Sequence, residues 1–131
     1  MRLTSIVFAL VTGFATVAFA QTWEGFPPYP GSKDLCDQRV YGNAREIHWA
    51  AYTSSDPPQV VTAFYEARLG KPETDKGEAR FRAAKEGAVE RVLSVYPIGA
   101  SYSYPRCGKD PDADDGARAR TMLIVSRAIA R

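Results

Sequence analysis

One segment of the chain carries a clear helical pattern, and it limits the folds that the rest can adopt. Within residues 59–69, apolar side chains at helical spacing form one stripe: Val61, Phe64, Tyr65 and Leu69. Residues 54–56 offer N-cap side chains, residues 57–58 are prolines suited to a first turn, and Gly70 favours a stop. An apolar stripe must be buried against another layer of structure. The pattern therefore predicts a single amphipathic helix lying on strands.

Segments with strand-like composition lie on both sides of this helix. They cover residues 36–41, 44–53, 79–83, 89–98 and 121–126. Turn residues at 42–43 and 85–87 join neighbouring segments as hairpins. In the second segment Ile47, Trp49 and Ala51 occupy alternate positions, which predicts one buried and one wetter face. The last segment is continuously apolar, as in a central strand. We expect an α+β fold with one helix on a four- to five-stranded, mainly antiparallel sheet.

The first twenty residues have the layout of a secretory signal peptide. A basic start at Arg2 precedes an apolar run over residues 3–19, and residues 18–20 form an A-x-A site. The run is also about as long as a membrane span, which is the alternative. Cleavage after Ala20 predicts a secreted or periplasmic domain, residues 21–131, without stable membrane insertion.

Residues 21–32 form a proline-rich arm that cannot be helical. Pro30 and Gly31 suit the centre of a type II turn. The arm carries three aromatic residues: Trp23, Phe26 and Tyr29. We expect them to dock on the domain's own core, the alternative being that they bind a ligand.

Two cysteines, Cys36 and Cys107, lie in the part of the chain that would be exported. An oxidising compartment favours one disulfide between them, worth up to about 4 kcal/mol for a loop of about 70 residues. A catalytic thiol and a metal site are the alternatives. A metal site needs three or four ligands, whereas the chain holds two cysteines and one histidine.

Two short stretches resemble a pattern found in uncharacterised small exported bacterial domains. Tyr29, Pro30 and Gly31 match a Y-P-G turn, and residues 56–65 match a D-x-P-x-x-V-x-x-F-Y helix, although Val60 and Val61 share one apolar position. The resemblance implies export and an α+β fold. It implies no activity and no catalytic residues.

Candidate chemistry is sparse. His48, the one histidine, lies two residues from Glu46 on the same strand face, so the two could form an acid–base pair, but no third catalytic partner accompanies them. A second hypothesis is a cationic and aromatic patch for a carboxylate, phosphate or glycan, made of His48, Tyr52, Arg80, Arg82 and Tyr96, with Arg91 nearby. The alternative for these arginines is a solvated sheet face on which they pair with glutamates.

The aspartate-rich segment 110–115 alternates like a calcium loop, but its glycine is not at the sixth position and Thr121 stands where a glutamate is needed. We favour a solvated acidic loop. The formal charge of +2 argues against nucleic acid as a partner, and the chain has no cofactor-binding motif.

These observations favour an exported, non-enzymatic domain that binds a protein partner or a small, anionic ligand in the cell envelope. The alternatives are a small hydrolase centred on His48 and Glu46, and a structural envelope protein without a discrete site. The oligomeric state stays open.

Overall fold

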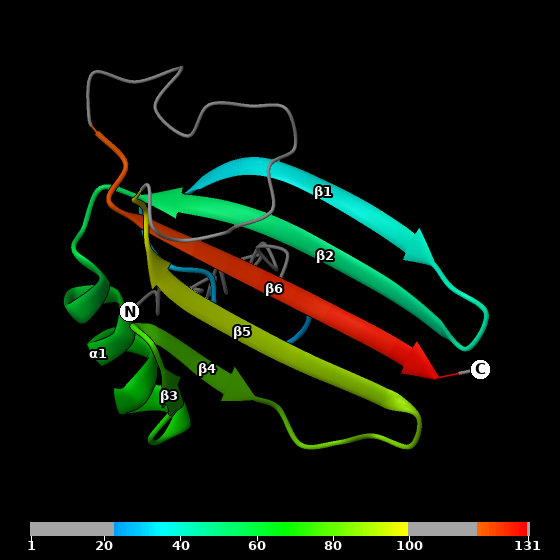
Figure 1. The fold of residues 1–131 in the computed structure, drawn as a ribbon. Coiled ribbons are helices and arrows are strands. Elements are labelled where there is room, and N and C mark those ends of the chain that lie inside the picture. The colour runs from blue at the N-terminus through cyan, green and yellow to red at the C-terminus, as the bar shows by residue number, and fades with distance from the viewer. Residues whose placement is uncertain (1–22, 100–117, 131) are drawn as a thin grey trace, which may run out of the picture.

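The computed structural model describes residues 23–99 and 118–130, which form one antiparallel sheet and one helix (Figure 1). The elements are β1 (Lys33–Tyr41), β2 (Arg45–Ser54), α1 (Pro58–Leu69), β3 (Glu73–Asp75), β4 (Glu78–Arg82), β5 (Val89–Pro97) and β6 (Thr121–Ala130). The α+β class and the antiparallel sheet are thus confirmed. Within the described ranges, α1 is too short and too polar to cross a membrane.

The sheet has six strands rather than the predicted four to five. The extra strand is β3, which lies in a segment whose polar composition suggests a loop. Lys76 and Gly77 both have positive φ angles, 47° and 85°. Two such residues form the two-residue turn whose twist matches that of paired strands, so β3 folds back on β4 as a hairpin despite having no buried side chain.

The strand order is β1-β2-β6-β5-β4-β3, so the last strand lies between the β1–β2 hairpin and the run of β3, β4 and β5. Residues 121–125 are all buried, which confirms the predicted central strand. The strand is longer than predicted and continues to Ala130, which pairs with Arg45 of β2. Pairing on both sides holds this end of β6 extended even though its side chains are less apolar.

Helix α1 packs on one face of the sheet, against β5. Val61 and Tyr65, one turn apart, have no exposed surface, and Phe64 is partly buried beside them. The prediction that Leu69 also faces the core is wrong, because this last helical residue lies past the contact with the sheet and is 43% exposed. Gly70 ends the helix as predicted, with a φ of 85°.

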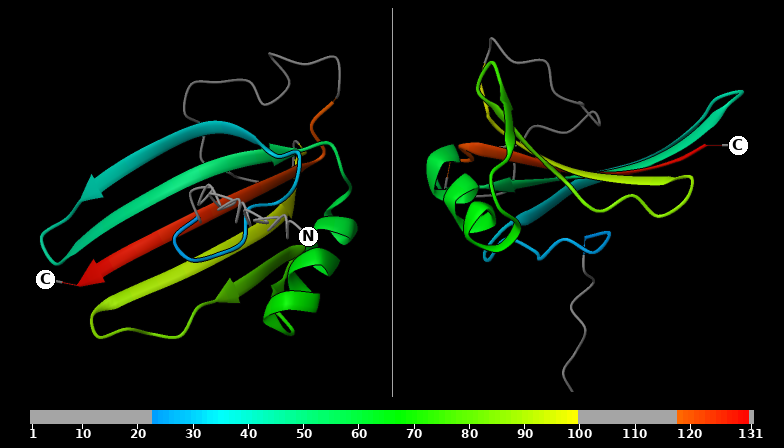
Figure 2. Two further views of the ribbon diagram at one scale, coloured as in Figure 1. Left: turned by 180° about the vertical axis from the view of Figure 1, so that it is seen from behind. Right: turned by 90° about the horizontal axis from the view of Figure 1, so that it is seen from below.

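The N-terminal arm lies on the same face of the sheet as α1 (Figure 2). Its three aromatic side chains are buried in the core between arm, helix and sheet: Trp23, Phe26 and Tyr29. The Tyr65 hydroxyl donates a hydrogen bond to the Pro27 carbonyl at 2.8 Å. Docking of the arm on the domain's own core is therefore confirmed.

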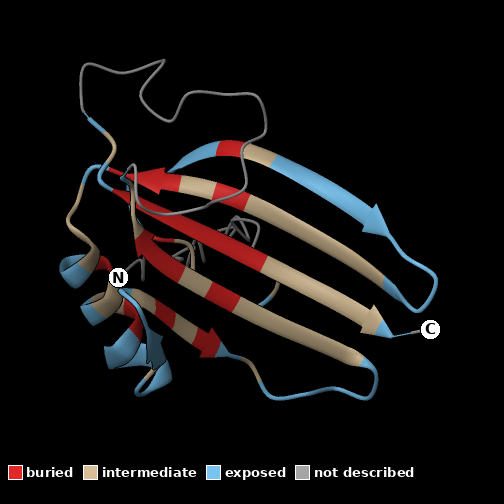
Figure 3. Cartoon of the chain, viewed as in Figure 1, coloured by how far each residue is buried: buried red, intermediate tan, exposed pale blue. Residues whose placement is uncertain are grey.

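In the two longest strands, β2 and β6, the buried residues lie at one end of the strand, and the other end is more exposed (Figure 3). The prediction of one buried and one wetter face in β2 is wrong in detail. The helix covers the face that carries Tyr52, while Ala51 belongs to a second buried cluster on the other face. In the first part of β2, residues 45–50, and the last part of β6, residues 126–130, neither face carries a buried side chain. This half of the helix-side face is open to solvent.

Candidate functional site

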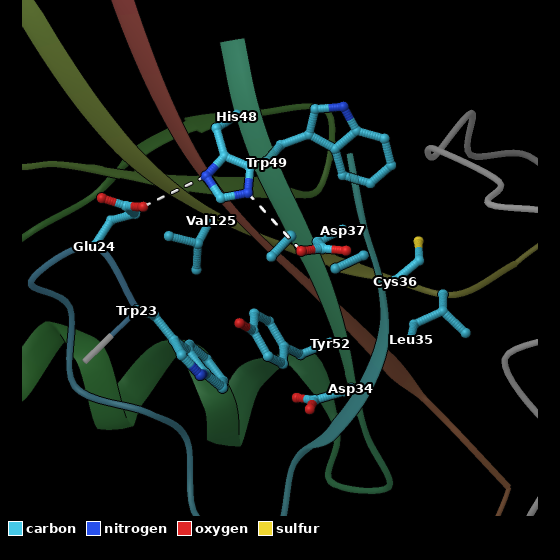
Figure 4. Close-up of a pocket in the computed structure, with 12 residues that line it drawn as sticks. Trp23, Glu24, Asp34, Leu35, Cys36, Asp37, His48, Trp49, Tyr52 and Val125 are labelled. Atoms are coloured by element: carbon cyan, nitrogen blue, oxygen red, sulfur yellow. Dashed lines mark ion pairs between the residues drawn. The ribbon is translucent and has the colours of Figure 1, made fainter. Parts of the chain in front are cut away.

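A hollow of about 620 Å³ opens where the arm meets β1 and β2 (Figure 4). We call it the aromatic hollow. It is lined by Trp23, Glu24, Asp34, Leu35, Cys36, Asp37, His48, Trp49, Ala50, Ala51, Tyr52 and Val125. The arm, two neighbouring strands and the central strand all contribute, so the hollow exists only in the folded domain.

The wall of the hollow is a pair of stacked aromatic rings. Trp23 lies 3.9 Å from Tyr52 between ring centroids, with 15° between the ring planes. A tight turn positions the indole: Glu24 and Gly25 have φ angles of 49° and 90°, and the Phe26 N–H donates to the Trp23 carbonyl at 2.8 Å. The turn holds Trp23 against the sheet and directs Glu24 to the rim (Figure 4).

Three carboxylates surround this pair: Glu24, Asp34 and Asp37. Burial raises the pKa of the Tyr52 hydroxyl, and the negative charges of Asp34, Asp37 and Glu24 raise it further. Side chains from the arm, β1 and β2 therefore interact electrostatically at this site. At neutral pH the hydroxyl is protonated and the rim is negatively charged.

His48 lies between two of these carboxylates. Its Nδ1 is 3.8 Å from Glu24 Oε1, and its Nε2 is 3.9 Å from Asp37 Oδ2. About a third of the His48 side chain is exposed, as is a similar share of Glu24, whereas Asp37 is 77% exposed. The imidazole is therefore held at the mouth of the hollow rather than in its interior.

A smaller hollow of about 150 Å³ continues from His48 over the open half of the sheet. We call it the second hollow. It is lined by Arg39, Glu46, His48, Arg127 and Ile129. The prediction that Glu46 and His48 share a strand face agrees with this arrangement.

The residues of the predicted patch do not form one surface. His48 and Tyr52 lie in the aromatic hollow, on the helix side. Tyr96 belongs to the buried cluster on the other side of the sheet. Arg80 and Arg82 share that other side, because they alternate along β4 with Ala79 and Phe81 of the helix-side core.

The predicted arginines already have carboxylate partners. Arg80 binds Glu78 through two hydrogen bonds of 3.0 and 3.3 Å. Arg82 binds Glu73 at 3.2 Å and Glu90 at 2.5 Å. Arg91, on the helix side, binds Glu86 at 2.9 Å. An external anion would therefore have to compete with these carboxylates for the guanidinium groups.

Among the side chains that line the two hollows, no serine or threonine hydroxyl stands beside His48 and Glu46. Cys36 points to the other side of β1, away from His48 (Figure 4). The raised pKa of Tyr52 keeps its hydroxyl protonated and thus poorly nucleophilic. In the described ranges, no group of three or more His, Cys, Asp or Glu side chains is placed so that it could hold a metal ion.

Several predictions fall on residues outside the described ranges. They concern the signal peptide, the acidic segment 110–115 and Cys107. The disulfide between Cys36 and Cys107 therefore stays a prediction.

Sequence reasoning missed most of the hollow. Asp34 and Asp37 are three residues apart, a spacing that places side chains on opposite faces of a regular strand. The strand is irregular, however: Asp34 pairs with Tyr52 and Cys36 with the adjacent Ala51, so Leu35 is an extra residue. This bulge brings both aspartates to the helix side. The aspartates and Glu24 were visible in the sequence, but no local pattern joins them.

No family model matches the chain, and neither a curated protein nor a solved structure does. The geometry of the hollows is thus the ground for a functional assignment.

Proposed function

We propose that the chain is an exported, non-enzymatic binding module of the cell envelope. Its ligand site is the aromatic hollow, and the ligand carries a positively charged group next to an apolar one. The observation that carries the proposal is the grouping of Glu24, Asp34 and Asp37 around the stacked Trp23 and Tyr52.

The size and lining of the hollow support this ligand class. A volume of about 620 Å³ lies within the range of sites for small organic molecules. Carboxylates beside aromatic rings favour ammonium or guanidinium groups, through charge attraction and through the electron-rich ring faces. The apolar part of the ligand would contact Trp23, Ala50 and Val125. A free small molecule and a lysine, arginine or amino terminus of a protein partner both satisfy this description.

The anionic ligand expected from the sequence has less support as the main occupant of the aromatic hollow. Arg80 and Arg82 lie on the other side of the sheet and bind glutamates of the same chain. The hydrolase alternative gains no support from the lining residues, because none of those that the structure describes brings a serine or threonine hydroxyl beside His48 and Glu46.

A matched pair of probes tests the proposal. Phenethylamine has an aromatic ring and an ammonium group, and its N-acetyl derivative keeps the ring but loses the charge. Residues 21–131, labelled with ¹⁵N, are titrated with each probe. We expect saturable shifts of the Trp23 indole N–H and the His48 amide with the amine, and binding at least tenfold weaker with the acetylated probe.

Variants at the rim show whether the carboxylates are responsible. Asp34→Asn with Asp37→Asn should weaken amine binding about tenfold or more. Asp75→Asn, an equally conservative change on the exposed strand β3, should leave it unchanged. Circular dichroism checks that the variants are folded. Equal binding of both probes, or shifts at residues far from the hollow, would refute the proposal.

A further inference from the structure

Basic side chains form a row across the open half of the sheet, beside the acidic rim. Arg39 of β1 pairs with His48 of β2, His48 pairs with Arg127 of β6, and Arg127 pairs with Arg91 of β5. Residues paired directly across antiparallel strands share a face. We call these four residues the basic row. It lies on the helix side, because Arg91 is two residues from the core residue Leu93.

Such a row is unfavourable for the domain by itself. Like charges directly opposite each other on neighbouring strands destabilise a sheet. Arg91 and Arg127 are opposite each other, and Arg91 is compensated by Glu86. Arg39 forms no ion pair with the part of the chain that the structure describes. Arg127 lies 4.0 Å from Glu24, with 40% of its side chain exposed. Glu46 is the one carboxylate that lines the second hollow with them.

The two oppositely charged regions are neighbours. Asp37 and Arg39 are two residues apart on the same side of β1, a separation of about 7 Å along an extended strand. His48 lines both hollows. A ligand held at the acidic rim by its positive end would therefore reach the basic row with a group about 7 Å away.

From this arrangement we propose that the ligand is a zwitterion, and specifically a short peptide with both termini free. Its amino terminus lies among Glu24, Asp34 and Asp37, and its carboxylate lies between Arg39 and Arg127. A dipeptide has the required length, since two extended residues span about 7 Å. A guanidinium group presents a fork of donors that fits a carboxylate. This inference rests on the proposed function, because it takes the amine site in the aromatic hollow as given.

Four forms of one dipeptide separate the two proposals. Leucyl-leucine is titrated in its free form, N-acetylated, C-amidated and blocked at both ends, with residues 21–131 and the same NMR readout. The free form should bind at least tenfold more tightly than either singly blocked form. The doubly blocked form should show no saturable shifts.

Arginine variants locate the carboxylate. Arg39→Gln and Arg127→Gln should each weaken binding of the free dipeptide about fivefold or more, without changing binding of the amidated form. Arg82→Gln removes a guanidinium on the other side of the sheet and is the matched control, with no expected effect.

Each outcome decides between the proposals. If amidation has no effect while acetylation weakens binding, the zwitterion is wrong and the proposed function stands. If acetylation has no effect, both are wrong. If phosphoethanolamine, which carries an ammonium and a phosphate, binds more tightly than the dipeptide, the assignment to a peptide carboxylate is wrong. If no form of the dipeptide binds, the inference is overturned, and the phenethylamine titration separately decides the proposed function.

Discussion

Replacing Tyr29 by phenylalanine should destabilise the domain through the loss of one hydrogen bond. The Tyr29 hydroxyl donates to Asp56 Oδ2 at 2.5 Å and so links the arm to the segment between β2 and α1. The ring itself would stay packed, because its edge-on contact with Phe64, 5.1 Å between centroids, does not involve the hydroxyl. The effect of the substitution is thus restricted to the polar contact.

The size of the effect follows from the surroundings of the two groups. Tyr29 is buried, with 6% of its surface exposed, and Asp56 is partly buried. Hydrogen bonds to charged groups contribute about 1.5–3 kcal/mol. Since water can still reach Asp56 in the variant, we expect a loss of about 2 kcal/mol in the free energy of unfolding. Urea denaturation of residues 21–131, followed by tryptophan fluorescence at pH 7, measures it.

A double-mutant cycle with Asp56→Asn tests whether the loss comes from this contact. Asp56 is among the N-cap candidates of the sequence, yet Pro57 occupies the N-cap and no side chain caps α1. Asp56→Asn therefore should not weaken the helix, and the two substitutions should be coupled by at least about 1 kcal/mol. A coupling energy near zero would show that Asp56 stabilises the domain independently of Tyr29, and our reasoning would be refuted.

The hydrogen bond between Tyr29 and Asp56 also predicts that the stability of the domain depends on pH in the alkaline range. Burial raises the pKa of Tyr29 to about 12, and the hydrogen bond to Asp56 and its negative charge contribute to the increase. Because the pKa is about 10 in the unfolded chain, the folded state favours the protonated hydroxyl. The stability difference between the wild type and Tyr29→Phe should be constant below pH 10 and decrease between pH 10 and 12. A difference that grows over this interval would contradict the assigned contact.

Three further changes test the fold. Tyr65→Ala should cost about 3–5 kcal/mol by urea denaturation, while Leu69→Ala at the exposed end of α1 should cost less than about 1 kcal/mol; equal losses would mean that the helix is rotated. Gly77→Ala should cost about 1 kcal/mol, because its φ of 85° is unfavourable for alanine, and no loss would argue against the tight β3–β4 turn. Cys36→Ser and Cys107→Ser should destabilise the unreduced protein equally, by up to about 4 kcal/mol, with no further loss in the double variant if the two cysteines are bridged; additive losses would exclude the disulfide.

The sequence by itself determined the local elements. The prolines, the glycine and the spacing of apolar residues around residues 57–70 were enough to predict the helix, because helical contacts join residues three and four positions apart. The β1–β2 and β4–β5 hairpins, which were predicted, are local in the same sense, since turn residues lie between adjacent strand-like segments. The continuously apolar start of β6 indicated a central strand.

Only the tertiary structure decided what these elements place together. The insertion of β6 between β2 and β5 brings Arg127 beside His48 and Arg91, which are 43 residues apart in the numbering of the chain. The bulge at Leu35 directs Asp34 and Asp37 to one side, and the arm brings Trp23 onto Tyr52. Register, strand order and the face that the helix covers depend on contacts between segments that are distant in the sequence. Alternative pairings of these segments would bury the same apolar side chains, and only the folded structure shows which pairing forms. No local sequence pattern shows which pairing forms, so the two hollows could be identified only from the folded structure.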